Sequence, residues 1–149
     1  MDIHSPERRT RIMAAIPGKD TKPELIVRSI AHRLGFRFRL HRRDLPGSPD
    51  LAFPRLHRVV FVHGCFWYQH DCRPGNHRPK SRIEFWRRKF IQNAARDRRS
   101  VRELSQQGWQ VLVIWECETR DKDKLARRLR GFLSARRSNW IRLTGDRDR

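Results

Sequence analysis

Two cysteines and a histidine occur within the stretch FVHGCFWYQHDC, residues 61–72, at the spacing C-x4-H-x-C. Three such side chains in one short loop can reach a single ion, and a tetrahedral zinc site needs a fourth ligand. Cys117, the remaining cysteine, completes the set if its strand lies beside and parallel to the strand before Cys65; Asp71 or His63 could replace one ligand. The alternative is three unrelated thiols, one of them buried. The predicted ligands of a structural zinc site are Cys65, His70, Cys72 and Cys117.

An aspartate and a histidine lie where a nuclease could hold a catalytic metal ion. Asp50 follows the turn LPGSPD at the head of a short strand, and His63 ends the next strand. A hairpin of this length can bring the two together, in a sparse version of the nuclease pattern P-D-x(n)-(D/E)-x-K, whose acidic groups hold Mg²⁺ at the scissile phosphate. An aspartate is also common in turns, and Glu24 fits a capping-box role behind Thr21. Both carboxylates therefore have a structural as well as a catalytic interpretation.

Asp97 lies on the apolar side of a long predicted helix, seven residues after Phe90 and four before Val101. An inward carboxylate is costly unless it is paired. Its partner is either a histidine near the active edge or an arginine such as Arg98, and the sequence favours neither. Asp97 is therefore a candidate catalytic residue only if the histidine is its partner.

The charge of the chain indicates an anionic partner. Its 149 residues include 35 Lys and Arg against 16 Asp and Glu, a formal net charge of +19. No fold requires this excess, which is typical of nucleic-acid binding; a ribosomal-type or merely solubilising basic surface is the alternative. No apolar run reaches membrane-spanning length, and the first residues lack a signal-peptide core. We therefore expect a cytoplasmic, nucleoid-associated protein whose three cysteines stay reduced.

Alternating helices and strands must position these residues. Periodicity and capping signals predict helices over residues 22–34, 82–107 and 121–136, and strands over 36–40, 51–53, 58–63 and 109–117. The inward helix faces are predicted to consist of Leu25, Ile26, Ile30 and Leu34, then Trp86, Phe90, Ala94, Val101 and Leu104, and finally Leu125, Leu129, Phe132 and Leu133. This order indicates an α/β sandwich around a small mixed sheet. We expect a flexible basic arm over residues 1–20, one domain over 21–138 and a disordered tail over 139–149.

Several segments together resemble the very-short-patch mismatch repair endonucleases. They are GKDTKPE, LPGSPD, FVHGCFW followed by HDC, EFW, N..RD and GW.VLV.WEC, in the family's order and spread over about residues 7–118. The resemblance implies a variant of the restriction-endonuclease fold, PD-(D/E)XK, with a mixed central sheet flanked by helices. It implies an enzyme that nicks double-stranded DNA 5′ to the thymine of a T:G mismatch, which arises when 5-methylcytosine deaminates. Polymerase and ligase then complete the repair.

The resemblance also implies the cofactors and their residues. Asp50 and the Val62 carbonyl match the family's Mg²⁺ contacts, Glu24 matches a holder of metal-bound water, and His63 matches a catalytic histidine. The family's structural Zn²⁺ ligands match the four residues predicted above from their spacing. The expected partner is DNA with a T:G mismatch, bound by a monomer; whether mismatch-repair proteins assist is left open.

Aromatic and basic residues are expected to contact the DNA. Phe66, Trp67 and Trp86 match aromatics that wedge between stacked bases, which costs a few kcal/mol of stacking and is cheapest at a mismatch. Core packing is the alternative for Trp86. The arginines expected to clamp the duplex or contact its backbone are Arg8, Arg9 and Arg11 on the arm and Arg87 on the long helix.

Two positions depart from the family pattern. Val62 replaces a frequent threonine but keeps the backbone carbonyl, so we expect little loss. Tyr68 replaces a histidine with an acid–base role; tyrosine is a poor base at neutral pH, although it can donate a hydrogen bond. General acid–base help is worth about 10²–10⁴-fold, so the enzyme is expected to be slow unless His63 carries that work alone. The alternatives are a weak or inactive zinc-stabilised reader of mismatched DNA, and a general basic nucleic-acid binder.

Overall fold

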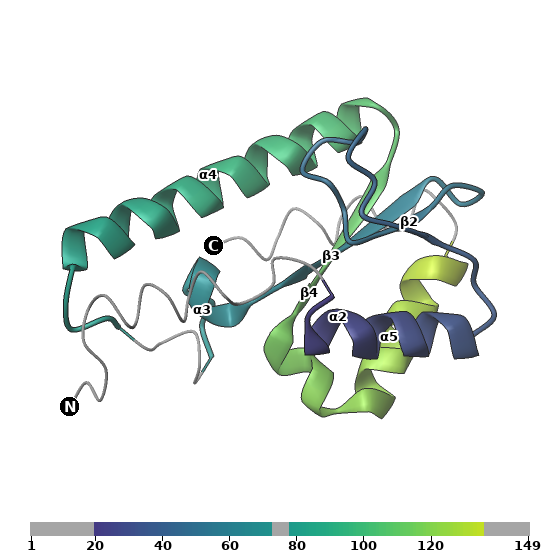
Figure 1. The fold of residues 1–149 in the computed structure, drawn as a ribbon. Helices are drawn as coiled ribbons and strands as arrows, with labels where there is room; N and C mark the ends of the chain where they lie inside the picture. Colours follow the sequence, from purple (N-terminus) through teal and green to yellow (C-terminus); the bar gives the residue numbers. More distant parts are fainter. Residues whose placement is uncertain (1–19, 73–77, 136–149) are drawn as a thin grey trace.

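The computed structural model describes residues 20–72 and 78–135, which form a four-stranded sheet with helices on both faces. The strands are β1 (Arg39–Leu40), β2 (Leu51–Phe53), β3 (Arg58–His63) and β4 (Gln110–Trp115), in the spatial order β1-β2-β3-β4. The pairs β1–β2 and β2–β3 are antiparallel, whereas β3 and β4 are parallel. Helix α4 (Ile83–Gln106) lies on one face, and α2 (Lys22–Arg33) and α5 (Lys122–Ser134) lie on the other (Figure 1). The predicted mixed α/β architecture is confirmed.

The alternation of side chains along β3 divides the core into two layers. Val60 packs with α2 and α5, whereas Val59 and Phe61 pack against the α4 side with Leu104. Because successive strand residues point to opposite faces, His63 belongs to the α4 face together with Val59 and Phe61. The sequence of β3 therefore directs His63 toward the helix that carries Asp97.

The end of α2 explains why the predicted strand over residues 36–40 is mostly absent. Gly35 has φ +87°, a conformation that glycine adopts without strain. Its N–H donates to the His32 carbonyl, and the Phe36 N–H donates to the Ala31 carbonyl, which together form a Schellman motif. The Phe36 N–H is therefore used by the helix C-terminus and does not pair with a strand. Only Arg39–Leu40 pairs as β1.

The predicted inward face of α2 is wrong at one position. Leu25 is 50% exposed, and the fully buried positions are Val27 and Ala31. The buried stripe is therefore rotated from the predicted one, and Val27, Ile30 and Ala31 pack in one core cluster with the buried residues of α5. The predicted inward residues of α5 are confirmed, since all four are buried.

The strand predicted over residues 109–117 is also shorter than expected. It ends at Trp115, and the chain continues as the 3₁₀ helix η1 (Glu116–Arg120), which contains Cys117. The Glu118 side chain accepts a hydrogen bond from the Trp115 N–H, which begins this turn. Cys117 therefore lies just past the strand rather than at its last residue. The predicted end of α4 before Gly108 is confirmed.

The described part of the chain leaves out residues 1–19, 73–77 and 136–149. The predicted arm except Asp20, its three arginines and the predicted tail therefore lie outside it. Within the described ranges, no helix is both long and apolar enough to cross a membrane.

Candidate active site

Asp50 is held at the open end of the β2–β3 hairpin. Its Oδ2 accepts a hydrogen bond of 2.7 Å from the Val62 N–H, twelve residues along the chain and adjacent to His63. Asp50, Val62 and His63 line one cavity of about 690 Å³, to which Glu24 and Tyr68 also contribute. The hairpin thus brings the predicted carboxylate and histidine to the same cavity.

The electrostatics of Asp50 indicate a place for a cation. Burial first, and the neighbouring Glu24 carboxylate second, raise the pKa of Asp50 to about 7, against the lowering effects of the Val62 hydrogen bond and of the Arg28 charge. A carboxylate in this situation is stabilised by any positive charge brought next to it. Carboxylate and carbonyl oxygens are the donors that Mg²⁺ takes from proteins. The residues present therefore fit a magnesium ion.

Glu24 faces this cavity although it lies in the first turn of α2. Its Oε2 accepts a hydrogen bond of 2.6 Å from the Asp20 N–H, and its own N–H is 3.4 Å from the Thr21 hydroxyl. The Glu24 carboxylate therefore accepts from the backbone N–H of the residue before the N-cap. A capping box would require it to accept from the N–H of Thr21, the N-cap residue itself. Its side chain is only 4% exposed.

His63 is paired with Asp97, which selects between the two partners that the sequence left open. The distance from His63 Nε2 to Asp97 Oδ1 is 2.7 Å, and both side chains are largely buried. An ionised carboxylate only accepts hydrogen bonds, so Nε2 carries the proton and Nδ1 has the lone pair. Asp97 thereby fixes the tautomer of His63.

Tyr68 stacks on His63 with ring centroids 4.1 Å apart and planes 18° apart. Burial raises the pKa of Tyr68 to about 12, and the Asp97 charge adds to this increase. The phenol therefore keeps its proton at neutral pH and can only donate it in a hydrogen bond. It holds the histidine ring in place from one side.

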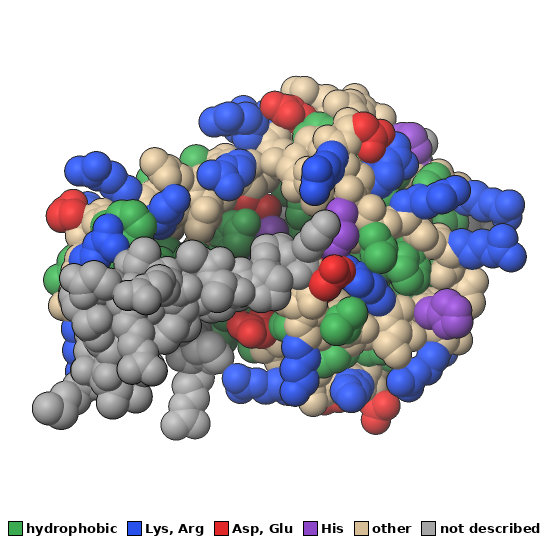
Figure 2. Space-filling view, in the orientation of Figure 1, with side chains coloured by type: hydrophobic (Ala, Val, Ile, Leu, Met, Phe, Trp, Pro, Cys, Tyr) green, Lys and Arg blue, Asp and Glu red, His purple; other side chains and the backbone are tan. Residues whose placement is uncertain are grey.

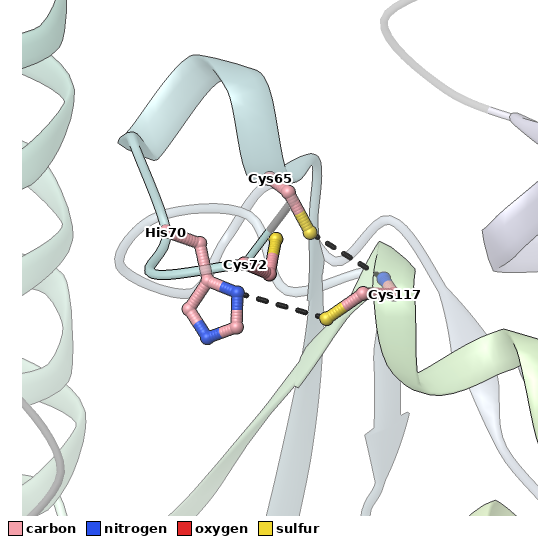
Figure 3. A group of neighbouring side chains, drawn as sticks. All are labelled: Cys65, His70, Cys72 and Cys117. Carbon is pink, nitrogen blue, oxygen red and sulfur yellow. Dashed lines mark hydrogen bonds between the residues drawn. The ribbon is translucent and has the colours of Figure 1, made fainter. Parts of the chain in front are cut away.

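The four predicted zinc ligands converge (Figure 3). Cys65 comes from the start of α3 (Cys65–Tyr68), His70 and Cys72 from the loop behind it, and Cys117 from η1. Their ligand atoms all lie within 4.8 Å of one another. The Cys117 Sγ is 3.6 Å from His70 Nδ1, and the Cys65 Sγ accepts a hydrogen bond of 3.4 Å from the Cys117 N–H.

This cluster has the donor set and the dimensions of a tetrahedral metal site. Zinc–sulfur bonds of about 2.3 Å at tetrahedral angles put ligand atoms about 3.5–4 Å apart, so a small contraction suffices. Burial raises the pKa of Cys65 to about 12, and the adjacent Cys72 and Cys117 thiols contribute to the increase. A cation is what would allow these thiols to ionise together.

The predicted wedge residues form one aromatic group over the N-terminal half of α4. Phe66 lies 5.5 Å from Trp67 and 5.4 Å from Trp86, measured between ring centroids. Asn93 donates a hydrogen bond of 3.0 Å to the Trp67 carbonyl and so ties the group to α4. Trp86 is only 8% exposed, which agrees with packing among the rings, whereas Phe66 and Trp67 are half-buried.

Basic side chains surround the acidic cavity. Figure 2 shows Lys and Arg side chains along α4 and around the rim of this face, with acidic and histidine side chains in the hollow between. Arg87 is among the exposed residues of α4. This arrangement suits a polyanion that lies across the rim and presents one phosphate to the hollow.

Sequence reasoning missed Arg28 and His41, which lie beside Glu24 and Asp50. The His41 N–H donates to the Asp50 carbonyl at 3.2 Å, so the β1–β2 pairing continues past the strands and carries His41 into the cavity. For Arg28, the four-residue spacing from Glu24 on a helix was an available signal. For His41 the sequence contained no comparable signal, because the position of His41 follows from the register of the β1–β2 pairing.

The site combines a buried carboxylate with a histidine–aspartate pair at the end of two parallel strands. In a chain this basic, these features define an α/β protein that acts on nucleic acid.

The sequence model of the family DNA mismatch endonuclease Vsr matches residues 1–74. The chain is 51% identical over 132 residues to the type II nicking enzyme V.XorIIP of Xanthomonas oryzae pv. oryzae, covering 89% of this chain and 96% of that protein. It is 38% identical over 140 residues to the DNA mismatch endonuclease Vsr of Escherichia coli, covering 94% and 87%. The chain therefore belongs to the Vsr family of DNA mismatch endonucleases.

Proposed function

We propose that this protein is a Mg²⁺-dependent DNA endonuclease that nicks one strand of a duplex on the 5′ side of the thymine in a T:G mismatch. The cut would initiate very short patch repair of deaminated 5-methylcytosine. The observation that carries the proposal is the joint placement of Asp50, His63 and Asp97 at one cavity, in a chain of the Vsr family. We further propose that the sheet is a variant of the restriction-endonuclease fold and that the enzyme acts as a monomer.

Asp50 and the Val62 carbonyl would hold Mg²⁺, and Glu24 would hold its water shell. When bound, the ion supplies charge stabilisation at the scissile phosphate and at the leaving 3′-oxygen. The Val62 N–H orients the Asp50 carboxylate for this role by its 2.7 Å hydrogen bond. Valine is sufficient at this position, because only its backbone is used.

His63 would accept the proton of the attacking water through Nδ1. Asp97 holds the opposite ring nitrogen, at 2.7 Å, and its negative charge stabilises the imidazolium that forms. Tyr68 keeps its proton and would donate a hydrogen bond to a phosphate oxygen. The products would be a 5′-phosphate and a 3′-hydroxyl.

Recognition would depend on the aromatic group and on the Cys/His cluster. A structural zinc ion bound by the cluster would fix α3, and Phe66, Trp67 and Trp86 would enter the base stack beside the mismatch. Phe66 and Trp67 already pack against Trp86 of α4, with ring centroids 5.4 Å and 5.7 Å away. The N-terminal arm with Arg8, Arg9 and Arg11 would clamp the duplex, with an affinity that falls steeply with salt.

A nicking assay with a labelled duplex that carries a single T:G pair tests the proposal. Cleavage of only the thymine strand, dependent on Mg²⁺ and absent from the paired duplex, is expected. The Asp50→Ala variant should lose nicking and retain binding, whereas the exposed Asp123→Ala variant serves as the matched control. Mismatch-preferring binding without any nicking would instead indicate a reader, and equal binding of paired and mispaired duplexes would indicate a general basic binder.

A further inference from the structure

We propose that Trp115 is a positioning residue that fixes the ring plane of His63 and connects this plane to the Cys/His cluster through His70. The inference rests on the proposed function, because it concerns the histidine that would accept the proton of the attacking water. It gives the cluster a second role besides the support of α3, namely the support of this histidine.

The hydrogen bond to Asp97 fixes one atom of His63 but not the plane of its ring. The bond joins Nε2 to Asp97 Oδ1 at 2.7 Å, and the ring can tilt about this contact, because hydrogen bonds tolerate a range of angles. A tilt changes the direction of the lone pair on Nδ1, the atom that would take the proton from water. The plane of the ring must therefore be set by the side chains that pack on it.

Three aromatic rings surround His63. Tyr68 stacks on it with centroids 4.1 Å apart, and Phe61 makes a tilted contact at 5.7 Å. Trp115 lies 5.4 Å away with its plane at 64°, an edge-to-face arrangement. Trp115 also meets Tyr68 edge to face, with centroids 5.8 Å and planes 75° apart. Because His63, Tyr68 and Trp115 contact one another, each of these rings limits the tilt of the other two.

The pairing of β3 with β4 places Trp115 beside His63. The two residues are partners in the parallel register, and each is the last residue of its strand. Partner residues on neighbouring strands point to the same side of a sheet, so the indole lies next to the imidazole. The Trp115 N–H donates to the Glu118 side chain, which holds the backbone of Trp115 where the strand ends.

A stacked contact joins Trp115 to the Cys/His cluster. The His70 imidazole lies 4.1 Å from the indole, with planes only 11° apart. Its Nδ1 faces the cluster, 3.6 Å from the Cys117 sulfur (Figure 3). An ion bound at Nδ1 would fix the imidazole plane through its coordination geometry, and the stacked indole would be held with it. Direct ring contacts therefore lead from the cluster through Trp115 to His63.

Replacement of the two stacked rings tests this inference. Trp115→Leu removes the indole, whereas His70→Cys removes the imidazole and keeps a ligand, since structural zinc is also bound by four cysteines. We expect each variant to lower the single-turnover nicking rate on a T:G duplex by about 10–100-fold. The affinity for that duplex should change by less than about threefold, because only the reacting geometry is disturbed. Trp115→Phe, which keeps an aromatic ring, should recover most of the rate.

Trp109 provides a matched control. It also stacks on a histidine, His57, with centroids 4.1 Å and planes 12° apart. It precedes the first residue of β4, however, and so lies about 20 Å from Trp115 along the strand. Trp109→Leu should therefore leave the nicking rate unchanged. The double variant of Trp115→Leu and His70→Cys should be no slower than the slower single variant, because both changes break the same series of contacts.

A spectroscopic measurement follows His63 itself and requires no catalysis. In zinc-loaded protein labelled with ¹⁵N-histidine, the Nε2–H proton that His63 shares with Asp97 should give a sharp downfield NMR signal, identified by its loss in Asp97→Ala. The signal should stay sharp in Trp109→Leu. It should broaden in Trp115→Leu and in His70→Cys, because the ring then samples several tilts.

The outcomes separate this inference from the proposed function. A folded, zinc-loaded Trp115→Leu variant with an unchanged rate and a sharp His63 signal would overturn the inference. If that variant does not fold, a zinc-loaded His70→Cys variant with the same two properties would overturn it. A loss of rate matched by an equal loss of duplex affinity would also overturn it. If the wild type nicks no duplex, the proposed function falls, and the His63 signal then decides the inference.

Discussion

Replacing Asp50 with asparagine should stabilise the metal-free protein at neutral and alkaline pH. The pKa of Asp50 rises from an ordinary 3.8 to about 7, primarily because of burial and also because of the Glu24 charge. Each pH unit of this rise corresponds to about 1.4 kcal/mol of extra cost for the charged form in the folded state, so the full cost is about 4 kcal/mol. Asparagine carries no such cost, and its side-chain oxygen can still accept the Val62 hydrogen bond.

The direction of the effect follows from the raised pKa. Below about pH 3.8 the aspartate is neutral in both folded and unfolded chains, and the two proteins should be equally stable. Between pH 3.8 and 7 the unfolded aspartate ionises while the folded one does not, so the wild type loses stability relative to Asp50→Asn. Above pH 7 the difference should be constant, at an upper bound of about 4 kcal/mol.

Urea unfolding of both proteins between pH 4 and 9, followed by circular dichroism, measures this difference. The exposed Asp123→Asn variant is the control and should change stability by less than about 1 kcal/mol. Added Mg²⁺ should stabilise the wild type and leave Asp50→Asn unaffected, since only the wild type keeps the full ligand. An Asp50→Asn protein that is less stable than the wild type at pH 8 without metal would refute the assignment of Asp50 as a desolvated, cation-seeking carboxylate.

Three further predictions concern the other groups of the site. Asp97→Asn should lower the single-turnover nicking rate by about 10²–10⁴-fold because His63 loses the charge that stabilises its protonated form; unchanged rates would exclude the pair from catalysis. Trp67→Ala should reduce the preference for T:G over paired DNA by about 1–3 kcal/mol, measured by fluorescence anisotropy, and an equal loss for both duplexes would contradict wedging. Elemental analysis should find one zinc per chain, and Cys117→Ala or a strong chelator should lower the midpoint of thermal unfolding by about 10 °C or more; an unchanged midpoint would argue against a structural ion.

The sequence predicted most of the elements because their signals are local. Thr21 and Gly35 bracket α2, and the continuous apolar run before His63 is typical of a central strand with both faces covered. The convergence of Cys65 and Cys117 was predictable too, since it required only that two neighbouring strands run in the same direction. Local patterns therefore suffice where a residue lies at the end of a regular element.

The sequence did not predict contacts that depend on strand register or on helix rotation. Leu25 fits an amphipathic stripe but is exposed, because the side of α2 that packs in the core with α5 is the one that carries Val27, Ile30 and Ala31. Asp97 pairs with His63 rather than with an arginine. To predict this pairing, one would have to know both which face of β3 carries His63 and where α4 lies. His41 reaches Asp50 only through the pairing that follows β1. Such contacts join segments that are far apart in the sequence, and no periodic pattern of residues indicates that these segments meet.

The aromatic group and Asp50, which we propose to recognise the mismatch and to bind the catalytic metal, are supported by different interactions on the two sides of Gly64. On one side, Val62 holds Asp50 from within β3, which pairs with β4 along its whole length. On the other side, α3 has four residues and no side-chain cap, and a single turn of this length is not stable on its own.

The Cys/His cluster supports α3 at both ends, with Cys65 before the rings and His70 and Cys72 after them, in addition to the Asn93 hydrogen bond to the Trp67 carbonyl. Gly64 allows Trp67 to fold back over the junction, because a Cβ there would lie 3.0 Å from the indole ring. If the cluster binds the proposed zinc ion, its loss should loosen the rings while the Asp50–Val62 hydrogen bond persists. We therefore predict that mismatch preference depends on the Cys/His cluster, whereas the affinity of the proposed catalytic site for a divalent ion does not.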